Sequence, residues 1–252
     1  RPTPVVWDSV DSITHLFEQS AHRSQSLSKK LITRFELGRT RRFEGWLLGQ
    51  FDQVLVTSRI DRDALLKIAR VPPVPVTVVP NGVDFEIFGA NADTHDAARE
   101  ADTLVFSGKM SYHANITAAL HLAQAIMPRI WEQRPAVKLV VVGKDPSAEV
   151  QALAQLHPDR ITVTGSVPDL AAYLRRAAVA VVPIVYGAGV QNKVLEAMAT
   201  ATPVVASTTA VSALDPSHVD ALLLAQDDAA FAAHVLRLLG DDALRRRYAA
   251  AG

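Results

Sequence analysis

The residues best suited to chemistry lie in one stretch, GAGVQNKVLEAMATATPVV, which spans residues 187–205. Gly187 and Gly189 let the backbone approach an anion closely, and a helix beginning after them would direct its N–H groups at that anion. Lys193 offers a cation for a diphosphate, and Glu196 offers a carboxylate for two ribose hydroxyls on roughly the same helical face. The stretch therefore favours a phosphate-binding loop that opens a helix. A tight turn followed by a surface Lys–Glu pair is the alternative that this spacing leaves open.

The order of apolar and helical segments predicts an α/β fold. Val-rich runs alternate with helical patterns, which indicates a parallel sheet covered by helices on both faces. Such sheets bind ligands beyond the carboxyl ends of their strands, so the loops after the strands are expected to form the site. The predicted strands are LVFS (104–107), LVVVG (139–143), ITVTG (161–165), VAVVPI (179–184) and PVVAS (203–207).

The N-terminal third shows the same alternation in a more charged setting. Its Asp and Ser residues in DSVDS (8–12) are predicted to cap a helix rather than to bind a ligand. Residues 89–102 are small and charged, which predicts a linker or a surface helix at a domain boundary. The predicted elements are strands at 5–7, 53–58 and 76–79 and helices at 24–48 and 59–70.

The composition excludes several classes of protein. Lys plus Arg and Asp plus Glu number 26 each among the 252 residues, so no bulk nucleic-acid binding is indicated. The chain has no cysteine, which excludes disulfides and thiolate metal sites. Its histidines are scattered, so no metal site is expected. No signal peptide and no apolar run of about 18 residues is visible, which favours a cytoplasmic protein.

Five ordered motifs resemble the family-4 retaining glycosyltransferases, which have the GT-B architecture of two Rossmann-like domains. The form GxGxxNKVLEAMA is similar to a subgroup associated with bacterial exopolysaccharide and exosortase systems. The chain begins without Met and ends within a helical pattern, so we expect a fragment with an incomplete N-terminal domain and no extreme C-terminus. The motifs are VVPNGVD (78–84), FSGKMSYHANI (106–116), LVVVGKDP (139–146), VTGSVPD (163–169) and KVLEAMA…PVVAS (193–207).

The resemblance implies a role for each matching residue. The diphosphate would be bound by Gly108, Lys109, Gly187, Gly189, Val190 and Lys193. Glu196 would bind the ribose, and the loop of Gly165, Ser166 and Val167 would contact the base. No metal and no cofactor beside the nucleoside-diphosphate sugar is implied. The catalytic groups on the acceptor side stay unassigned, because the missing segment is expected to hold them.

The resemblance also implies a reaction and a separate role for each of the two domains. Residues 1–88 would belong to the acceptor-binding domain and residues 89–252 to the donor-binding domain. A hexosyltransferase would move a sugar, with retention of configuration, to a glycan or lipid-linked acceptor in exopolysaccharide or other cell-surface glycan synthesis. The fragment alone would be inactive yet keep its nucleotide site. Two rival hypotheses remain: a nucleotide-binding module without transferase activity, and a GT-B sugar-nucleotide epimerase.

Three positions depart from the family pattern. Ala114 stands where the family usually has a second lysine in the first loop, and Lys193 offers that charge instead. Ala188 stands where the family commonly has the first of two glutamates, which leaves the contacts to the donor sugar open. Ala201 stands where a glycine ends the helix, and a left-handed conformation there would cost about 1 kcal/mol.

A basic run covers residues 23–42, in which seven Lys and Arg residues face one acidic residue, Glu36. A solvated helix face is one explanation of this run. The other is attraction to anionic lipid headgroups or to a lipid-diphosphate acceptor, which would make the protein peripheral at the inner face of the membrane.

Overall fold

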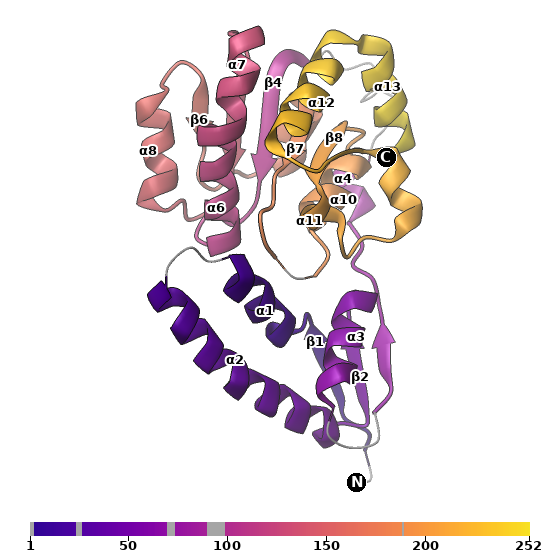
Figure 1. The fold of residues 1–252 in the computed structure, drawn as a ribbon. Helices are drawn as coiled ribbons and strands as arrows, with labels where there is room; N and C mark the ends of the chain where they lie inside the picture. Colours follow the sequence, from indigo (N-terminus) through magenta and orange to yellow (C-terminus); the bar gives the residue numbers. More distant parts are fainter. Residues whose placement is uncertain (1–2, 24–26, 70–73, 90–98, 188) are drawn as a thin grey trace. The chain divides into compact units, whose positions relative to one another are not determined.

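The computed structural model describes residues 3–23, 27–69, 74–89, 99–187 and 189–252. The chain forms two compact units (Figure 1). Both have parallel strands flanked by helices, which confirms the predicted α/β class. The first unit comprises Arg1–Asn81, Tyr186–Val190 and Ser212–Leu214, and the second comprises Gly82–Val185, Gln191–Val211 and Asp215–Gly252.

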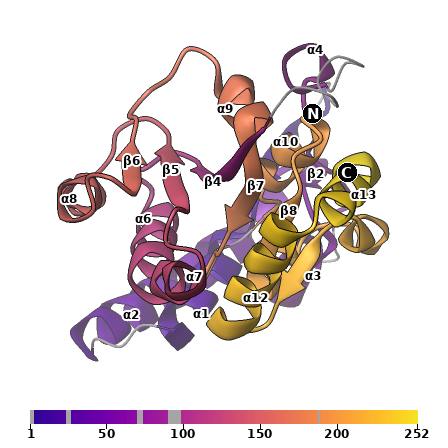
Figure 2. The same ribbon diagram turned by 90° about the horizontal axis from the view of Figure 1, so that it is seen from above.

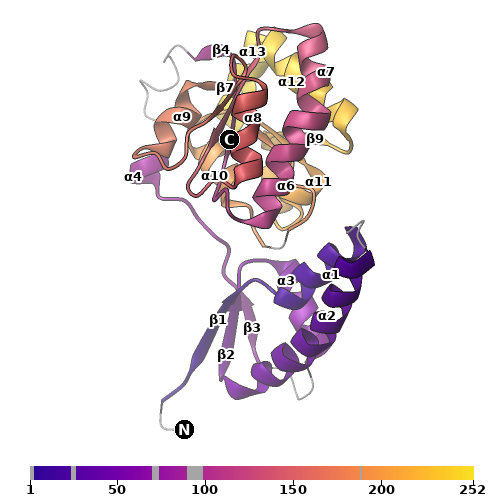
Figure 3. The same cartoon turned by 90° about the vertical axis from the view of Figure 1, so that its left-hand side faces the viewer.

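The first unit has a three-stranded parallel sheet in the order β1-β2-β3. Trp7 of β1 lies opposite Val54 of β2, and Val54 lies opposite Val76 of β3. Figure 3 shows the three helices of this unit along one face of the sheet. The elements are β1 (Val6–Val10), α1 (Ile13–Arg23), α2 (Leu27–Leu47), a 3₁₀ turn (Leu48–Gln50), β2 (Gln53–Val56), α3 (Arg59–Ile68) and β3 (Val76–Val78).

Two buried carboxylates fix the helices of this unit around its small core of Leu48, Val54, Val56 and Leu65. Glu44 of α2 accepts hydrogen bonds from the backbone N–H groups of Ile13 and Thr14, both at 2.9 Å. Asp61 of α3 accepts one from the Ser12 N–H at 3.0 Å and another from the Ser58 hydroxyl. Because a buried carboxylate needs such donors, the N-terminal turn of α1 is tied to α2 and α3.

The prediction that the aspartates of DSVDS cap a helix is wrong. Strand β1 continues through Asp8 to Val10, and Ser12 accepts the hydrogen bond from the His15 N–H at 3.2 Å. Asp11 instead accepts a hydrogen bond from the Thr57 hydroxyl at 3.3 Å. Helix α1 begins at Ile13, directly after this segment, so the serine part of the prediction is confirmed by Ser12.

The second unit has a six-stranded parallel sheet in the order β6-β5-β4-β7-β8-β9. Figure 2 shows α6, α7 and α12 on one face of the sheet and α9 and α10 on the other. The strands are β4 (Glu100–Ser107), β5 (Lys138–Val142), β6 (Ile161–Val163), β7 (Ala177–Val182), β8 (Val204–Ser207) and β9 (Leu223–Ala225). The helices are α4 (Phe85–Phe88), α6 (His113–His121), a π turn (Leu122–Ile126), α7 (Met127–Gln133), α8 (Ala148–Leu156), α9 (Leu170–Arg176), α10 (Asn192–Ala199), α11 (Thr208–Val211), a 3₁₀ turn (Pro216–Ala221), α12 (Asp228–Gly240) and α13 (Asp242–Ala251).

The five predicted strands of this unit are present, with two differences at its margins. Strand β4 begins at Glu100, within the segment predicted as a linker, because Glu100 pairs with Ala177 of β7. Residues 90–98 of that segment lie outside the described residues. Strand β9 was not predicted, because its three residues LLA are too few to show a strand pattern.

Helix α10 ends in a Schellman motif whose C′ residue is Ala201, with φ of 53°. The Ala201 N–H donates to the Met198 carbonyl at 2.8 Å, and the Thr202 N–H donates to the Ala197 carbonyl at 2.9 Å. Glycine usually occupies this position because a Cβ clashes in the left-handed region. Ala201 therefore adopts the left-handed conformation for which the sequence analysis gave only the cost.

We expect Ala201→Gly to raise the free energy of unfolding by about 0.5–1 kcal/mol. Relief of left-handed strain contributes roughly 1–2 kcal/mol, and the greater freedom of glycine in the unfolded chain offsets part of it. Urea unfolding followed by circular dichroism measures the change. Ala199→Gly, inside the same helix, is the control and should lower stability by about 1 kcal/mol. A loss of stability in Ala201→Gly would contradict the strain argument.

Candidate nucleotide-binding site

The strand order places a topological switch point beside β4. The first strand of the unit, β4, pairs with β5 on one side and with β7 on the other. The chain runs outward to β6 in one direction and to β9 in the other. In open parallel sheets the loops at such a point diverge and leave a crevice for ligands at the carboxyl ends of the strands. A ligand site is therefore expected at the loops after β4 and β7.

Three glycines end neighbouring strands in conformations that other residues avoid. Gly108, Gly143 and Gly165 follow β4, β5 and β6 with φ of 151°, 153° and 70°. A Cβ on Gly143 would lie 1.7 Å from the Gly108 carbonyl oxygen, so no side chain fits there. The Gly108 N–H donates to Val142 at 3.0 Å, and the Gly143 N–H donates to Gly165 at 3.1 Å. These hydrogen bonds join the three strand ends through their backbones.

Lys193, in the first turn of α10, points its ammonium toward the β4 side of the switch point. Its Nζ lies 2.9 Å from Oδ1 of Asn115 and 3.2 Å from Oε1 of Gln191. The same atom lies 5.7 Å from the centre of the Phe106 ring, within range of a cation–π interaction. The ammonium is thus held in place before any ligand arrives.

Asn115 is the residue that sequence reasoning missed. It lies in α6, is 6% exposed, and links two predicted site residues. Its Oδ1 accepts from Lys193, and its Nδ2 donates to the Lys109 carbonyl at 3.0 Å. Because an ammonium can only donate, it fixes which end of the amide faces it. The only sequence signal was the position of Asn115 inside the quoted FSGKMSYHANI motif.

Burial changes the titration of both charged residues on α10. It lowers the pKa of Lys193 to about 8, although the neighbouring carboxylate of Glu196 opposes the shift. Burial also raises the pKa of Glu196 above its usual range, and Lys193 opposes that shift in turn. Desolvation disfavours the charged form of each side chain. A ligand group that pairs with either charge would therefore be bound favourably in this environment.

The geometry argues against the alternative of a surface Lys–Glu pair. The Lys193 ammonium is bonded to two amide oxygens, and within the described residues the Glu196 carboxylate makes no ion pair or hydrogen bond. Glu196 is only partly exposed. A half-buried carboxylate without such a donor is suited to receive hydroxyl groups.

The helices on the two sides of the switch point differ from their neighbours in their N-caps. Ser147, Asp169 and Asp227 cap α8, α9 and α12 with their side chains. In α6 and α10 the N-cap residues Tyr112 and Gln191 make no such bond. The side chains of these two N-cap residues therefore leave the first turns of α6 and α10 uncapped, where an anion would be favoured by the helix dipole.

The structure brings four of the ten predicted site residues together and places the other six in two further loops. Gly108, Lys109, Lys193 and Glu196 gather at the switch point, and Lys109 extends its side chain into solvent. The loop of Gly165, Ser166 and Val167 follows β6, with Ser166 exposed. Gly187, Gly189 and Val190 lie in the loop between β7 and α10, which groups with the first unit; Gly189 has φ of 69°. Ala188 lies outside the described residues.

The described residues contain no cluster of three or more His, Asp or Glu side chains arranged to hold a metal ion. His121 pairs with Asp228 at 2.8 Å, and His15 pairs with Gln19 at the same distance.

Two units of parallel strands flanked by helices, the second with a switch point beside its first strand, are the arrangement of the GT-B class, which glycosyltransferases of known structure share. Residues 101–241, more than half of the chain, match the family model for glycosyl transferases group 1. Residues 20–87 match the model for glycosyltransferase family 4. The chain belongs to the family of glycosyl transferases group 1.

Among curated proteins, the chain is similar to the phosphatidyl-myo-inositol mannosyltransferase of Mycobacterium leprae (strain TN). The two are 32% identical over 178 residues, covering 69% of this chain and 47% of the relative. The chain thus spans about half the length of the curated relatives it matches.

Two solved structures show the same fold. The glycosyltransferase WaaG, involved in lipopolysaccharide biosynthesis, superimposes with a TM-score of 0.72 at 14% identity over 98% of this chain and 68% of its own. Anabaena Alr3699/HepE in complex with UDP-glucose gives a TM-score of 0.69 at 16% identity, over 99% of this chain and 66% of its own. At these identities the likeness concerns the fold alone.

Proposed function

We propose that the full-length protein transfers a sugar from a nucleoside-diphosphate sugar to a glycan or lipid-linked acceptor, with retention of configuration. The setting would be exopolysaccharide or other cell-surface glycan synthesis. Residues 89–252 would bind the donor and residues 1–88 would contribute to the acceptor-binding domain. The observation that carries the proposal is the pre-positioned Lys193 ammonium, held by Asn115 at the switch point of the second sheet. A UDP-glucose complex of HepE and the mannosyltransferase activity named for the mycobacterial relative support the substrate class.

Each site residue would then have one task toward the donor. Lys193, Lys109 and the backbone of Gly108, with Gly187, Gly189 and Val190, would bind the diphosphate. The half-buried carboxylate of Glu196 would accept hydrogen bonds from the ribose, and the loop at 165–167 would contact the base. Lysines and helix N–H groups supply positive charge here, so the proposal includes no divalent metal and no further cofactor.

Catalysis would depend on positive charge that is already in position before the donor binds. As the bond between C1 of the sugar and the diphosphate oxygen breaks, negative charge develops on the leaving diphosphate, next to Lys193. Pre-positioned donors stabilise such charge without reorganising, which lowers the barrier. For retention, the acceptor hydroxyl would attack from the side on which the diphosphate leaves. A diphosphate oxygen would take the hydroxyl proton as the new glycosidic bond forms.

The test uses the full-length protein with UDP-glucose, UDP-N-acetylglucosamine and GDP-mannose and with membrane lipid extract as the acceptor. We expect one donor to be consumed and the product to keep the donor's anomeric configuration in its NMR coupling constants. Nucleotide binding without turnover would instead favour a non-catalytic module. Release of free nucleoside diphosphate with epimerised sugar in the absence of acceptor would favour an epimerase.

The lowered pKa of Lys193 predicts a pH dependence of nucleoside diphosphate binding. Below a pKa of about 8 the ammonium is charged and binding should be constant; above it the affinity should fall by up to about tenfold for each pH unit. Folding stability should change in the opposite sense. The unfolded chain keeps this proton up to about pH 10.5, so the contribution of Lys193 to stability rises between pH 8 and 10. Calorimetric titration from pH 6.5 to 9.5 measures the first effect, and Lys193→Met should abolish it.

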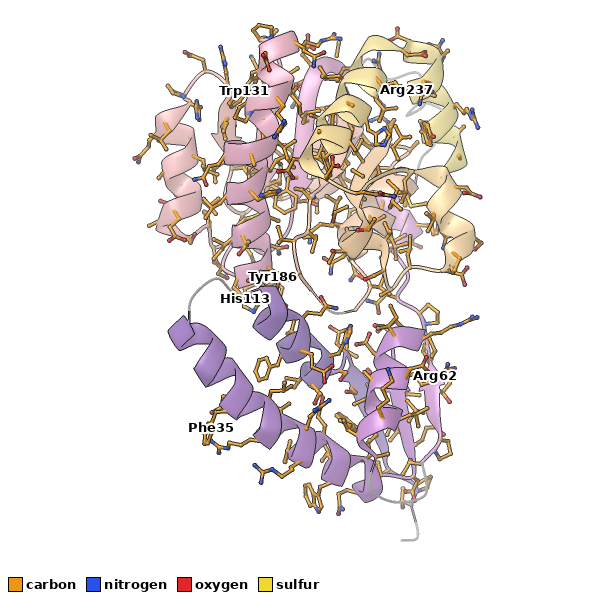
Figure 4. All side chains as sticks on the ribbon, in the orientation of Figure 1. Phe35, Arg62, His113, Trp131, Tyr186 and Arg237 are labelled. Atoms are coloured by element: carbon orange, nitrogen blue, oxygen red, sulfur yellow. The ribbon has the colours of Figure 1, made fainter. Side chains whose placement is uncertain are left out.

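The basic run and the exposed side of α2 support peripheral contact with a membrane. Residues 24–26 of the run, and the side chains of the run up to residue 34, lie outside the described part of the chain. Farther along α2, Phe35, Phe43 and Trp46 are 68%, 58% and 53% exposed, and Figure 4 shows Phe35 on the outer side of the helix. Arg39 lies over the Phe35 ring at 5.8 Å. Aromatic rings beside arginines suit the headgroup region of an anionic bilayer. No helix among the described residues is both long and apolar enough to span a membrane.

We expect the protein to sediment with vesicles that contain phosphatidylglycerol but not with pure phosphatidylcholine vesicles. Phe43→Ser with Trp46→Ser should reduce the bound fraction several-fold, because about 2 kcal/mol or more of apolar burial is lost. The matched control is Leu156→Ser, which changes an exposed apolar residue of α8. Equal binding to neutral and anionic vesicles would contradict the proposal.

A further inference from the structure

Two glycines of the loop that precedes α10 are held by side chains of the first unit. Gly187 and Gly189 belong to the segment Tyr186–Val190, which groups with the first unit rather than with the second. Their partners are Gln19 of α1 and Asp11, which follows β1. The first of these contacts joins residues that are 168 positions apart in the sequence, yet both contacts lie inside one compact unit.

The backbone N–H of Gly187 is already bonded to a side chain. It donates to Oε1 of Gln19 at 3.2 Å. Because a backbone N–H can only donate, it fixes the orientation of the Gln19 amide, and Nε2 of Gln19 then faces His15 Nε2 at 2.8 Å. A neutral His15 accepts that hydrogen bond and carries its proton on Nδ1. Two consecutive hydrogen bonds therefore connect α1 to Gly187 and occupy its N–H group.

The Asp11 carboxylate packs directly against Gly189. A Cβ on Gly189 would lie 1.9 Å from Oδ1 and 2.8 Å from Oδ2 of Asp11, and the φ of 69° also favours glycine. The Thr57 hydroxyl donates to Oδ1 of the same carboxylate at 3.3 Å. Burial, and then the charge of Asp61, raise the pKa of Asp11, whereas the Thr57 hydroxyl opposes the shift. The carboxylate is thus fixed in a half-buried position beside the loop.

The next two N–H groups of the loop differ from that of Gly187. Within the described residues, the N–H groups of Gly189 and Val190 have no acceptor. Backbone N–H groups around a glycine turn are favourable donors to phosphate oxygens. Gly187 therefore anchors the loop, whereas Gly189 and Val190 offer the donors.

We propose that Gln19 and Asp11 are positioning residues for the donor diphosphate. They fix the backbone of Gly187 and Gly189 before the ligand binds. The N–H groups of Gly189 and Val190 are thereby ordered for phosphate oxygens, and less conformational freedom is lost on binding. The proposal rests on the proposed transferase function and refines it, because Gly187 holds the loop instead of donating to the diphosphate.

The first test is Gln19→Leu in the full-length protein, which removes the acceptor of the Gly187 N–H. Calorimetric titration with UDP and GDP should show the diphosphate that the protein takes bound about five- to tenfold more weakly. Uridine and guanosine should bind as they do to the unaltered protein, because they carry no phosphate. The control is Gln133→Leu, the same change at an exposed position of α7, which should leave the affinity for the diphosphate unchanged.

Hydrogen exchange reports on the anchor without any ligand. Gln19→Leu should make the Gly187 amide exchange several-fold faster, measured by mass spectrometry on a peptide that covers residues 185–190. Gln19→Glu keeps an acceptor oxygen at the same place, so its exchange should stay slow. Equal exchange in the Leu variant and the unaltered protein would show that the hydrogen bond does not hold the loop, and would overturn the role of Gln19.

A paired substitution tests the contact of Asp11. Gly189→Ala should weaken diphosphate binding about 100-fold, because its Cβ collides with the carboxylate and its backbone stays left-handed. Asp11→Ala in the same chain removes the obstacle and should recover about tenfold of that loss. Asp63→Ala, an exposed carboxylate of α3, is the matched control and should recover none.

The outcomes separate this proposal from the proposed function. Diphosphate affinity that Gln19→Leu leaves unchanged or increases would overturn the positioning role, since an increase would mean that Gln19 competes with the ligand. No recovery with Asp11→Ala would remove Asp11 from the proposal. If the unaltered protein binds neither UDP nor GDP, the proposed function fails and this proposal fails with it. Normal binding by the unaltered protein, together with no effect of the variants, counts against the positioning role alone.

Discussion

Lys193→Met is expected to weaken the binding of a nucleoside diphosphate by about 10- to 100-fold while the bare nucleoside binds almost as before. The change removes the one ammonium that Asn115 and Gln191 hold at the switch point, at 2.9 and 3.2 Å. A hydrogen bond to a charged group contributes roughly 1.5–3 kcal/mol to binding. The bare nucleoside has no phosphate, so the change removes no such bond from its complex. Calorimetric titration of both ligands gives the two dissociation constants directly.

Glu196→Gln provides the contrasting pattern in the same assay. Its carboxylate is proposed to hold the ribose, which both ligands carry, so both should bind more weakly and by a similar factor. Lys138→Met is the matched control for Lys193, because Lys138 is exposed at the amino end of β5, away from the carboxyl ends of the strands. Equal losses for nucleoside and diphosphate with Lys193→Met would rule out the phosphate role.

Arg99→Met is expected to produce the largest loss of folding stability, about 3–5 kcal/mol. The Arg99 guanidinium joins the C-terminal ends of α9 and α10, where the last carbonyls of a helix need donors from outside it. Burial lowers its pKa to about 10, so it stays charged at neutral pH. It donates to the carbonyls of Leu174, Arg175, Ala177, Thr200 and Ala201 and to the Thr202 hydroxyl at 2.7–3.3 Å.

The size of this loss follows from the acceptors left behind. Methionine preserves much of the side-chain volume but donates nothing, so several partly buried oxygens lose a charged donor together. Differential scanning calorimetry should show the melting temperature lowered by about 10 °C. Arg99→Lys keeps the charge but lacks the planar fork, and we expect an intermediate loss.

Arg237→Met is the control for this series, because Arg237 is exposed on α12 (Figure 4). It should change stability by less than about 1 kcal/mol. A melting temperature for Arg99→Met equal to that of the Arg237 control would show that the six contacts contribute little.

The sequence by itself determined the features that depend on neighbours along the chain. The parallel strands were visible because a strand covered on both faces needs a continuous apolar run. Lys193 and Glu196 were expected on one face of α10 because residues three apart in a helix lie side by side. The conformation of Ala201 followed from its position after the helix, where the Schellman motif demands a left-handed residue.

Only the tertiary structure decided which distant residues meet. The partner of Lys193 is Asn115, 78 positions earlier, and their contact exists because β4 and β7 pair at the centre of the sheet. The acceptors of Arg99 lie 75 to 103 positions away and come from two helix ends. Strand order and helix packing result from burial of whole faces, which no local spacing encodes.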